Sequence, residues 1–331
     1  MPEVDIGFNQ EGEEILRNDD VILSVEGLSK GYQELKAVNG ISFSVHKGEV
    51  FGLLGPNGAG KTTTIKMLCG LLKADAGSVT LNGISISSNY EHVKNMIGLC
   101  PQEIIVWELL TCLEQLKFMG MSYDMPSKAA SLKAESLLQS LGLWEKRNKL
   151  ARTLSGGMQR RLNIALALIH DPELIILDEP QAGLDPQSRI LVRDFIRQLA
   201  RQKTVILTTH DMDEADRLAD RIAIIDHGSI LLVDTPEKLK MRSGEGDILQ
   251  IRVNGLSKDL AAEILNSMPS GLAEKKYSDG FLFLGAEDLL ELIPTVNRIL
   301  KTYNICPEDM TIRKRTLEDA FIALTGRGLR E

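Results

Sequence analysis

The chain has 331 residues, of which 43% are hydrophobic and 25% charged, a globular composition that excludes disordered and fibrous proteins. Its longest apolar runs, such as Ile164–Ile169, are far shorter than the roughly 20 residues needed to cross a bilayer, so no membrane-spanning helix is expected. The formal net charge is −8, and residues 1–20 hold seven acids and one base, which leaves −2 for the remainder.

Segment 1–20 is rich in acids and is expected to be a flexible, solvated tail. It does not fit a secretory signal, because such a signal is basic and then apolar. The near-neutral remainder offers no basic stripe, so no nucleic-acid partner is expected. The four cysteines form no CxxC pair, which predicts reduced thiols in a cytoplasmic protein.

Apolar patterning divides the next part of the chain into strands and helices. Strands are predicted at residues 21–25, 41–45, 50–54, 174–177 and 204–207. A helix is predicted over 63–72 and a helical insertion over about 103–152. Strands alternating with helices are typical of a parallel α/β sheet, here interrupted by the insertion.

The insertion carries two apolar features. Leu132, Leu137, Leu138 and Leu141 are predicted to share one buried stripe. An apolar cluster, Ile104-Ile105-Val106-Trp107, stands at its start and leaves two interpretations open. The cluster packs inside the insertion, or it lines a groove that receives a helix of a partner protein.

Beyond about residue 235 the pattern changes. Strands are predicted at 248–253, 281–284 and 311–313, and helices at 289–300 and 317–324. This order fits a small α+β module of βαββαβ type over residues 236–331.

A glycine-rich segment follows the predicted strand 50–54. Gly55-Pro56-Asn57-Gly58-Ala59-Gly60-Lys61-Thr62 matches GxxxxGK[ST] between a strand and a helix, the context of a phosphate-binding loop. Glycines let backbone N–H groups wrap a phosphate chain, and the following helix directs its positive end at the same anion. Lys61 can reach the β and γ phosphates, and the Thr62 hydroxyl can ligate Mg²⁺. The segment, with Thr63, is therefore predicted to bind nucleotide.

Two adjacent carboxylates follow the buried strand 174–177. Asp178 is expected beside the phosphate loop, where a carboxylate can hold Mg²⁺ through its water shell. Glu179 is then placed to polarise an attacking water. The alternative for this acidic pair is a solvated strand edge.

The segment Leu154-Ser155-Gly156-Gly157-Met158-Gln159 narrows the class of protein. It resembles the signature of ABC-type ATPases, and the phosphate loop and acidic pair stand in the order expected of that family. The resemblance covers about residues 21–235. It implies a P-loop NTPase fold with a mixed sheet core, an antiparallel β subdomain and the helical insertion.

The same resemblance assigns further residues. Tyr32 resembles the aromatic residue that stacks on adenine, and His210 resembles the histidine that contacts the γ-phosphate. Gln102 is similar to the loop glutamine that touches Mg²⁺ and the nucleophilic water, and Glu179 becomes the base. Residues 182–185 resemble the segment through which two nucleotide sites communicate.

Two positions depart from the family pattern. Gln181 stands where threonine or a small residue is usual, and Cys100 where a bulky apolar residue is common. Neither removes a chemical group. Gln181 is expected to alter coupling at the subunit boundary and not the reaction.

The resemblance also implies partners. In this family the signature of one subunit closes over the nucleotide of another, so one loop and one signature imply a homodimer in which Ser155, Gly156 and Gly157 act in trans on ATP. The closing stretch 315–326 resembles that of exporter subunits for drugs, lipids or ions. The implied protein is an ATP-hydrolysing subunit on the cytoplasmic face of the membrane, bound to a separate transmembrane permease.

The alternative is a soluble ABC-type ATPase with a regulatory, non-transport role. Ribosome-acting members usually carry two cassettes, whereas this chain has one. Chromosome-organising members carry a long coiled coil, for which the 95 residues from Gly60 to Ser155 leave no room. Transport is the main prediction.

Overall fold

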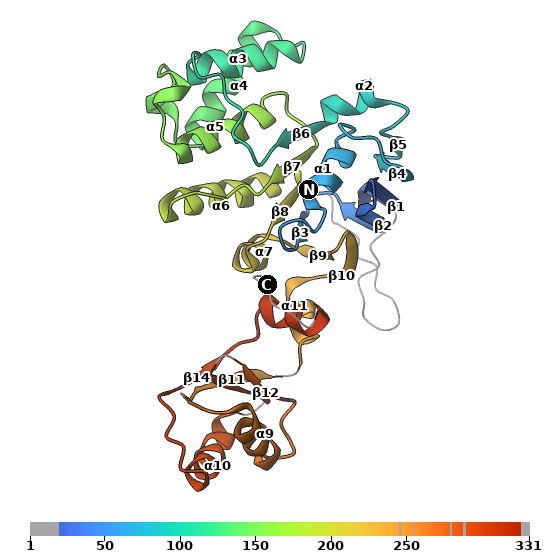
Figure 1. The fold of residues 1–331 in the computed structure, drawn as a ribbon. Helices are drawn as coiled ribbons and strands as arrows, with labels where there is room; N and C mark the ends of the chain where they lie inside the picture. The colour runs from blue at the N-terminus through green and yellow to red at the C-terminus, as the bar shows by residue number, and fades with distance from the viewer. Residues whose placement is uncertain (1–19, 245, 254, 279, 287–288, 326–331) are drawn as a thin grey trace, which may run out of the picture. The chain divides into compact units, whose positions relative to one another are not determined.

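The computed structural model describes residues 20–244, 246–253, 255–278, 280–286 and 289–325 (Figure 1). The predicted acidic tail lies outside these ranges, except for Asp20. The chain divides into two compact units, one ending at Val233 and the other beginning at Asp234. None of the helices in the described ranges is long and apolar enough to cross a bilayer.

A six-stranded sheet forms the centre of the first unit, in the order β10-β9-β3-β8-β7-β6. The strands are β3 (Val50–Leu54), β6 (Ile97–Cys100), β7 (Leu174–Asp178), β8 (Thr204–Thr209), β9 (Arg221–Asp226) and β10 (Ser229–Asp234). β3 pairs in parallel with β8 and β9, and β7 pairs in parallel with β6 and β8. Parallel strands end at one edge, so the segments that follow β3, β7 and β8 converge there.

An antiparallel sheet and one helix cover the first face of the central sheet. The sheet has the order β2-β1-β4-β5, formed by β1 (Val21–Tyr32), β2 (Leu35–His46), β4 (Ala76–Leu81) and β5 (Ile84–Ser85). Phe51 and Leu53 of β3 are buried in one cluster with Val25 of β1 and Ile65 of α1 (Lys61–Leu68). α1 begins two residues before the predicted helix, inside the glycine-rich segment, and ends early because Gly70 adopts a left-handed φ of 68°.

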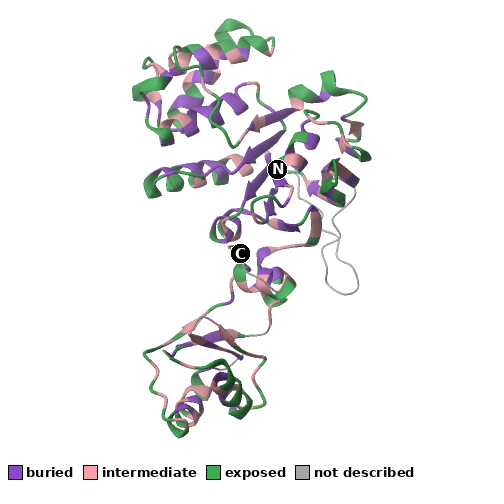
Figure 2. Cartoon of the chain, in the orientation of Figure 1, coloured by how far each residue is buried: buried purple, intermediate pink, exposed green. Residues whose placement is uncertain are grey.

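Helices cover the opposite face of the central sheet. They are α5 (Gly156–Leu168), α6 (Pro186–Ala200) and α7 (Met212–Leu218). Ile175 and Leu177 of β7 are buried together with Leu162 of α5 and Ile196 of α6. Figure 2 shows the buried central strands between these two layers.

The helical insertion is built from α3 (Cys112–Ser122), α4 (Ser127–Ser140) and short 3₁₀ turns at Trp144–Lys146 and Ala151–Thr153. A further short segment, α2 (Tyr90–Val93) with the turn Lys94–Met96, precedes β6. The predicted leucine stripe is partly wrong, because Leu132 is 61% exposed whereas Leu138 is fully buried. At 3.6 residues per turn, five residues separate Leu132 from Leu137 by about 140° around α4.

The second unit has the predicted βαββαβ order. Its antiparallel sheet runs β12-β13-β11-β14, formed by β11 (Asp247–Arg252), β12 (Glu274–Ser278), β13 (Phe281–Ala286) and β14 (Asp309–Arg313). The helices are α8 (Pro236–Met241), α9 (Lys258–Ser267), α10 (Leu289–Thr302) and α11 (Leu317–Thr325). Ile264 of α9 and Val296 of α10 are buried with Leu249 of β11 and Leu284 of β13.

The exposure of α4 gives a stability prediction. We expect Leu138→Ala to lower the free energy of unfolding by about 2–5 kcal/mol, because it removes a fully buried side chain. Leu132→Ala, on the same helix but 61% exposed, should change it by less than about 0.5 kcal/mol. Urea unfolding followed by circular dichroism measures both. Equal losses would contradict the described packing of α4.

Candidate functional site

The glycine-rich segment joins β3 to α1 in a conformation that only small residues allow. Gly60 has a left-handed φ of 103°, and a Cβ there would lie 2.3 Å from the carbonyl oxygen of Ala37. A Cβ on Gly55 would lie 2.2 Å from the carbonyl oxygen of Ile225. The glycines therefore let the loop pass close to neighbouring backbone.

The start of α1 is open to an anion. No side chain caps its N-terminus at Gly60, and its first turn holds no acid. These backbone N–H groups are therefore available to phosphate oxygens. Lys61, only 6% exposed, donates from Nζ to the carbonyl oxygens of Gly55 at 2.7 Å and Pro56 at 3.2 Å. Burial lowers the pKa of Lys61, and the Glu179 carboxylate opposes that shift.

Asp178, at the end of β7, faces two hydroxyl groups. Thr62 Oγ1 donates to its Oδ2 at 3.1 Å, and Thr208 Oγ1 donates to its Oδ1 at 2.5 Å. A carboxylate beside a hydroxyl is a donor set that Mg²⁺ accepts. In the described part of the chain, no group of three or more His, Cys, Asp or Glu residues could hold a metal alone. Thr62 and Asp178 thus fit a Mg²⁺ ion that is also bound by phosphate oxygens.

Glu179 lies between a buried amine and an exposed imidazole. Its Oε1 is 3.5 Å from Lys61 Nζ, and its Oε2 is 2.8 Å from His210 Nδ1. The Glu179 backbone has a left-handed φ of 49°, which is rare for a residue with a side chain. Its N–H donates to Thr208 Oγ1 at 3.0 Å. The structure therefore brings Lys61, Glu179 and His210 together.

Other predicted site residues lie apart from this cluster. Tyr32, at the end of β1, is 48% exposed with Lys30 over its ring. Gln102 is exposed, and its main-chain carbonyl accepts from Arg160. Ser155 caps α5, its Oγ accepting from Met158 N–H at 3.4 Å. Within the described ranges, no hydrogen bond joins the signature residues 155–157 to the phosphate loop.

Three residues of the site region were not predicted from the sequence. Thr208 bonds Asp178 and Glu179, and Glu214 accepts from Thr209 Oγ1 at 2.7 Å. The third is Arg160, which is 2% exposed and donates to main-chain carbonyls of two loops. The sequence signal for Arg160 was its place directly after the signature segment 154–159, on the same helix.

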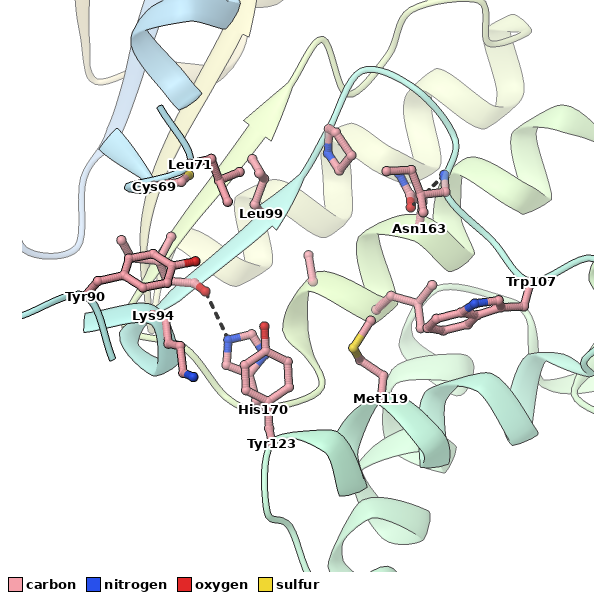
Figure 3. A pocket seen from close by; sticks show the side chains of 15 residues that line it. Cys69, Leu71, Tyr90, Lys94, Leu99, Trp107, Met119, Tyr123, Asn163 and His170 are labelled. Atoms are coloured by element: carbon pink, nitrogen blue, oxygen red, sulfur yellow. Dashed lines mark hydrogen bonds between the residues drawn. The ribbon is translucent and has the colours of Figure 1, made fainter. Parts of the chain in front are cut away.

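An apolar cavity of about 330 Å³ lies beside the Gln102 loop (Figure 3). Trp107 and Met119 line one end and Tyr90 lines the other, with Tyr123 and His170 stacked between them at 3.9 Å. The cluster predicted at residues 104–107 is mostly exposed, with Ile105 at 60% and Trp107 at 39%. These two side chains line the cavity, Trp107 also contacts Phe118 of α3 edge-to-face at 5.5 Å between ring centroids, and Val106 packs against the buried cluster that includes the insertion.

Comparisons with known proteins show the family of the chain. Residues 38–182 match the family described as ABC transporter. The linearmycin resistance ATP-binding protein LnrL of Bacillus subtilis is 38% identical over 94% of this chain and 100% of its own length. The Nod factor export ATP-binding protein I of Ralstonia nicotianae is 39% identical over 94% and 95%.

The chain belongs to the ABC transporter ATP-binding family. A solved dimer of the ATP-binding cassette MJ0796, bound to ADP and phosphate, matches with a TM-score of 0.60 and 25% identity over 64% of this chain and 98% of that one. The predicted P-loop α/β fold is confirmed. The chain is an ATP-binding, ATP-hydrolysing subunit of an ABC transporter, as the signature predicted.

Glu214 gives a pH prediction. Burial raises the pKa of its carboxyl from 4.5 to about 7, so the folded chain keeps a proton that the unfolded chain releases. Stability should therefore fall as pH rises through this window, by about 3 kcal/mol from this group. Glu214→Gln removes the titration and should stabilise the chain at pH 8 but not at pH 4.5.

The midpoint of thermal unfolding at the two pH values measures this difference. Asp213→Asn, an exposed acid on the same helix, is the matched control and should keep the wild-type dependence. An unchanged dependence in Glu214→Gln would contradict the role given to the buried carboxyl.

Proposed function

We propose that residues 21–235 hydrolyse ATP at the edge where β3, β7 and β8 end, and that hydrolysis in a homodimer drives export through a separate transmembrane permease. The observation that carries this is the Glu179 carboxylate, held by Lys61 and His210 beside the Thr62–Asp178 pair. Residues 236–331 would form an accessory domain. The complex would lie on the cytoplasmic face of the membrane.

The chemistry is transfer of the γ-phosphoryl group to water. The loop N–H groups and α1 hold the triphosphate, and Lys61 leaves its carbonyl partners to bind the β and γ phosphates. Mg²⁺, when bound by Thr62 and Asp178, neutralises charge on these phosphates. Glu179 accepts a proton from the water, whose oxygen bonds the γ-phosphorus as the bond to the β–γ bridging oxygen breaks.

His210 and Gln102 complete the catalytic group. His210 is 51% exposed and bonds Glu179, so it can turn towards a γ-phosphate while remaining next to the base. Gln102 stands on the loop after β6, the strand that pairs with β7. This exposed side chain would be a further Mg²⁺ ligand and would orient the attacking water. Tyr32, also exposed, would stack on the adenine.

The second copy would supply the missing phosphate ligands. Ser155 and Gly156 are exposed at the start of α5, and open space surrounds the Gly156 Cβ position. Such a helix N-terminus binds anions. Closing it over the partner's ATP would place one γ-phosphate between two chains, and hydrolysis would release them. The MJ0796 cassette, which was solved as a dimer, supports the pairing of two chains.

The permease would dock in the cavity beside Gln102. Ile105 and Trp107 give it an apolar wall that fits the apolar face of a cytoplasmic helix. Export is supported by the relatives, whose names describe linearmycin resistance and Nod factor export.

Substitution of the base tests the proposed reaction. Glu179→Gln should lower kcat by about 10²–10⁴-fold, because an amide cannot accept the proton, yet still bind ATP. Gel filtration with light scattering in Mg-ATP should show a stable dimer. Lys61→Ala, the control, should fail to bind ATP and elute as a monomer. A Glu179→Gln chain that binds ATP but remains monomeric would contradict the shared site.

Substitution in the cavity tests the docking site. Trp107→Asp should keep the ATPase rate of the isolated chain but reduce co-purification of the proposed permease about tenfold, because a charge would be buried in an apolar contact. Leu109→Asp, 72% exposed on the same loop, is the control and should retain co-purification. A collapse of the basal rate in Trp107→Asp would instead place Trp107 in the folding core.

A further inference from the structure

Arg160 is a buried cation whose hydrogen bonds all go to main-chain carbonyls. It lies on α5 and is 2% exposed. Its Nε donates to Pro180 O at 3.1 Å, and Nη2 donates to Asp178 O at 2.6 Å and Glu179 O at 2.8 Å. Nη1 donates to Pro101 O at 2.5 Å and Gln102 O at 3.0 Å. A guanidinium has five N–H donors, and these bonds use all of them.

These carbonyls belong to the two loops that the reaction needs. One loop follows β6 and carries Gln102, and the other follows β7 and carries Glu179. Three consecutive carbonyls, of Asp178 at the end of β7 and of the two residues after it, converge on the guanidinium where Glu179 adopts its left-handed φ of 49°. Such a backbone persists only when its surroundings fix it. Arg160 supplies that constraint from the carbonyl side and Thr208 from the N–H side.

A second contact ties α5 to the Gln102 loop. Asn163 lies three residues after Arg160, on the same helix face. Its Nδ2 donates to Glu103 O at 3.3 Å, and its Oδ1 accepts from Ile105 N–H at 3.3 Å. The loop is thus held to α5 at two points. Movement of α5 relative to β7 would shift the loop.

We propose that Arg160 is a positioning residue for hydrolysis, which fixes the Glu179 and Gln102 backbones to the helix that begins with the signature. This rests on the proposed function. Ser155 lies five residues before Arg160, about 7.5 Å along the helix axis. A partner nucleotide seated on Ser155 would therefore act, through one rigid helix, on the base of the chain's own site. Arg160 provides a physical connection between two ATP sites.

The test separates catalysis from binding. Arg160→Gln leaves carbonyls unpaired and frees the Glu179 loop, and a shift of about 1 Å in a catalytic group lowers the rate by about 100-fold. We expect kcat to fall by about that factor, while the dissociation constant of adenylyl-imidodiphosphate changes by less than about threefold. A time course of phosphate release measures kcat, and isothermal titration calorimetry measures the dissociation constant of the analogue.

Arg161→Gln is the matched control. Arg161 is also buried on α5, but it donates to the main-chain carbonyls of Leu141, Gly142 and Gly157, none of which belongs to either loop. Its loss should lower the thermal midpoint as much as Arg160→Gln does, with kcat within about threefold of wild type. Equal losses of kcat in the two variants would overturn the proposal, since packing of α5 would explain both. An Arg160→Gln kcat within threefold of wild type would overturn it as well.

Arg160→Lys covers the case in which Arg160→Gln does not fold. Lysine keeps the charge but has three donors and no planar fork, so it cannot hold both loops. We expect a folded chain with unchanged analogue binding and a kcat at least about tenfold below wild type, and wild-type kcat would overturn the proposal. If the wild-type chain had no Mg-ATPase activity, the proposed function itself would be wrong. If the wild type were active but the Arg160 variants kept its kcat, only the role proposed for Arg160 would be wrong.

Discussion

The arrangement of the site depends on giving partners to two adjacent acidic side chains that are buried inside the protein. Asp178 is 2% and Glu179 5% exposed, and a buried charge without partners is strongly destabilising. Hydroxyl donors face Asp178, and the amine of Lys61 faces Glu179. These donors come from α1 and β8, which only the parallel order β3-β8-β7 brings to the end of one strand. The sheet order is therefore what makes the acidic pair chemically useful.

Much of this could be predicted from the sequence, because the chemistry is carried by local patterns. A phosphate loop needs glycines and a lysine at fixed spacing, and the apolar run 50–54 marks β3 to the residue. The βαββαβ order of the second unit was likewise visible in the spacing of apolar residues. Family resemblance added His210, which lies 2.8 Å from Glu179. It also named Tyr32, Gln102 and the signature residues, whose contacts within one chain do not complete the site.

The rest depends on contacts distant in sequence. Nothing near Thr208 reveals that its hydroxyl bonds a carboxylate 30 residues away. Arg160 follows the signature segment, but nothing in that segment reveals that two loops bring their carbonyls to its guanidinium. Leu132 shows the opposite failure, since an apolar residue was assigned to the core although its position on α4 turns it outward. Composition and periodicity predict whether a segment is a helix or a strand. Which polar side chain finds a hydrogen-bond partner depends on which distant segments the fold brings together.

Several locally unfavourable features meet at the same edge of the sheet. The start of α1 has no cap, Glu179 has a left-handed backbone, Lys61 is buried, and burial raises the pKa of Glu214 to about 7. A single substitution could remove the cost of each feature. Each feature nevertheless leaves a group able to bind phosphate, contact water or hold a proton. The apolar side chains that are buried on both sides of the sheet stabilise the fold and offset the free-energy cost of these features. A rigid sheet with a strained edge is suited to this reaction, because binding of the triphosphate supplies partners to the phosphate loop and to the uncapped start of α1.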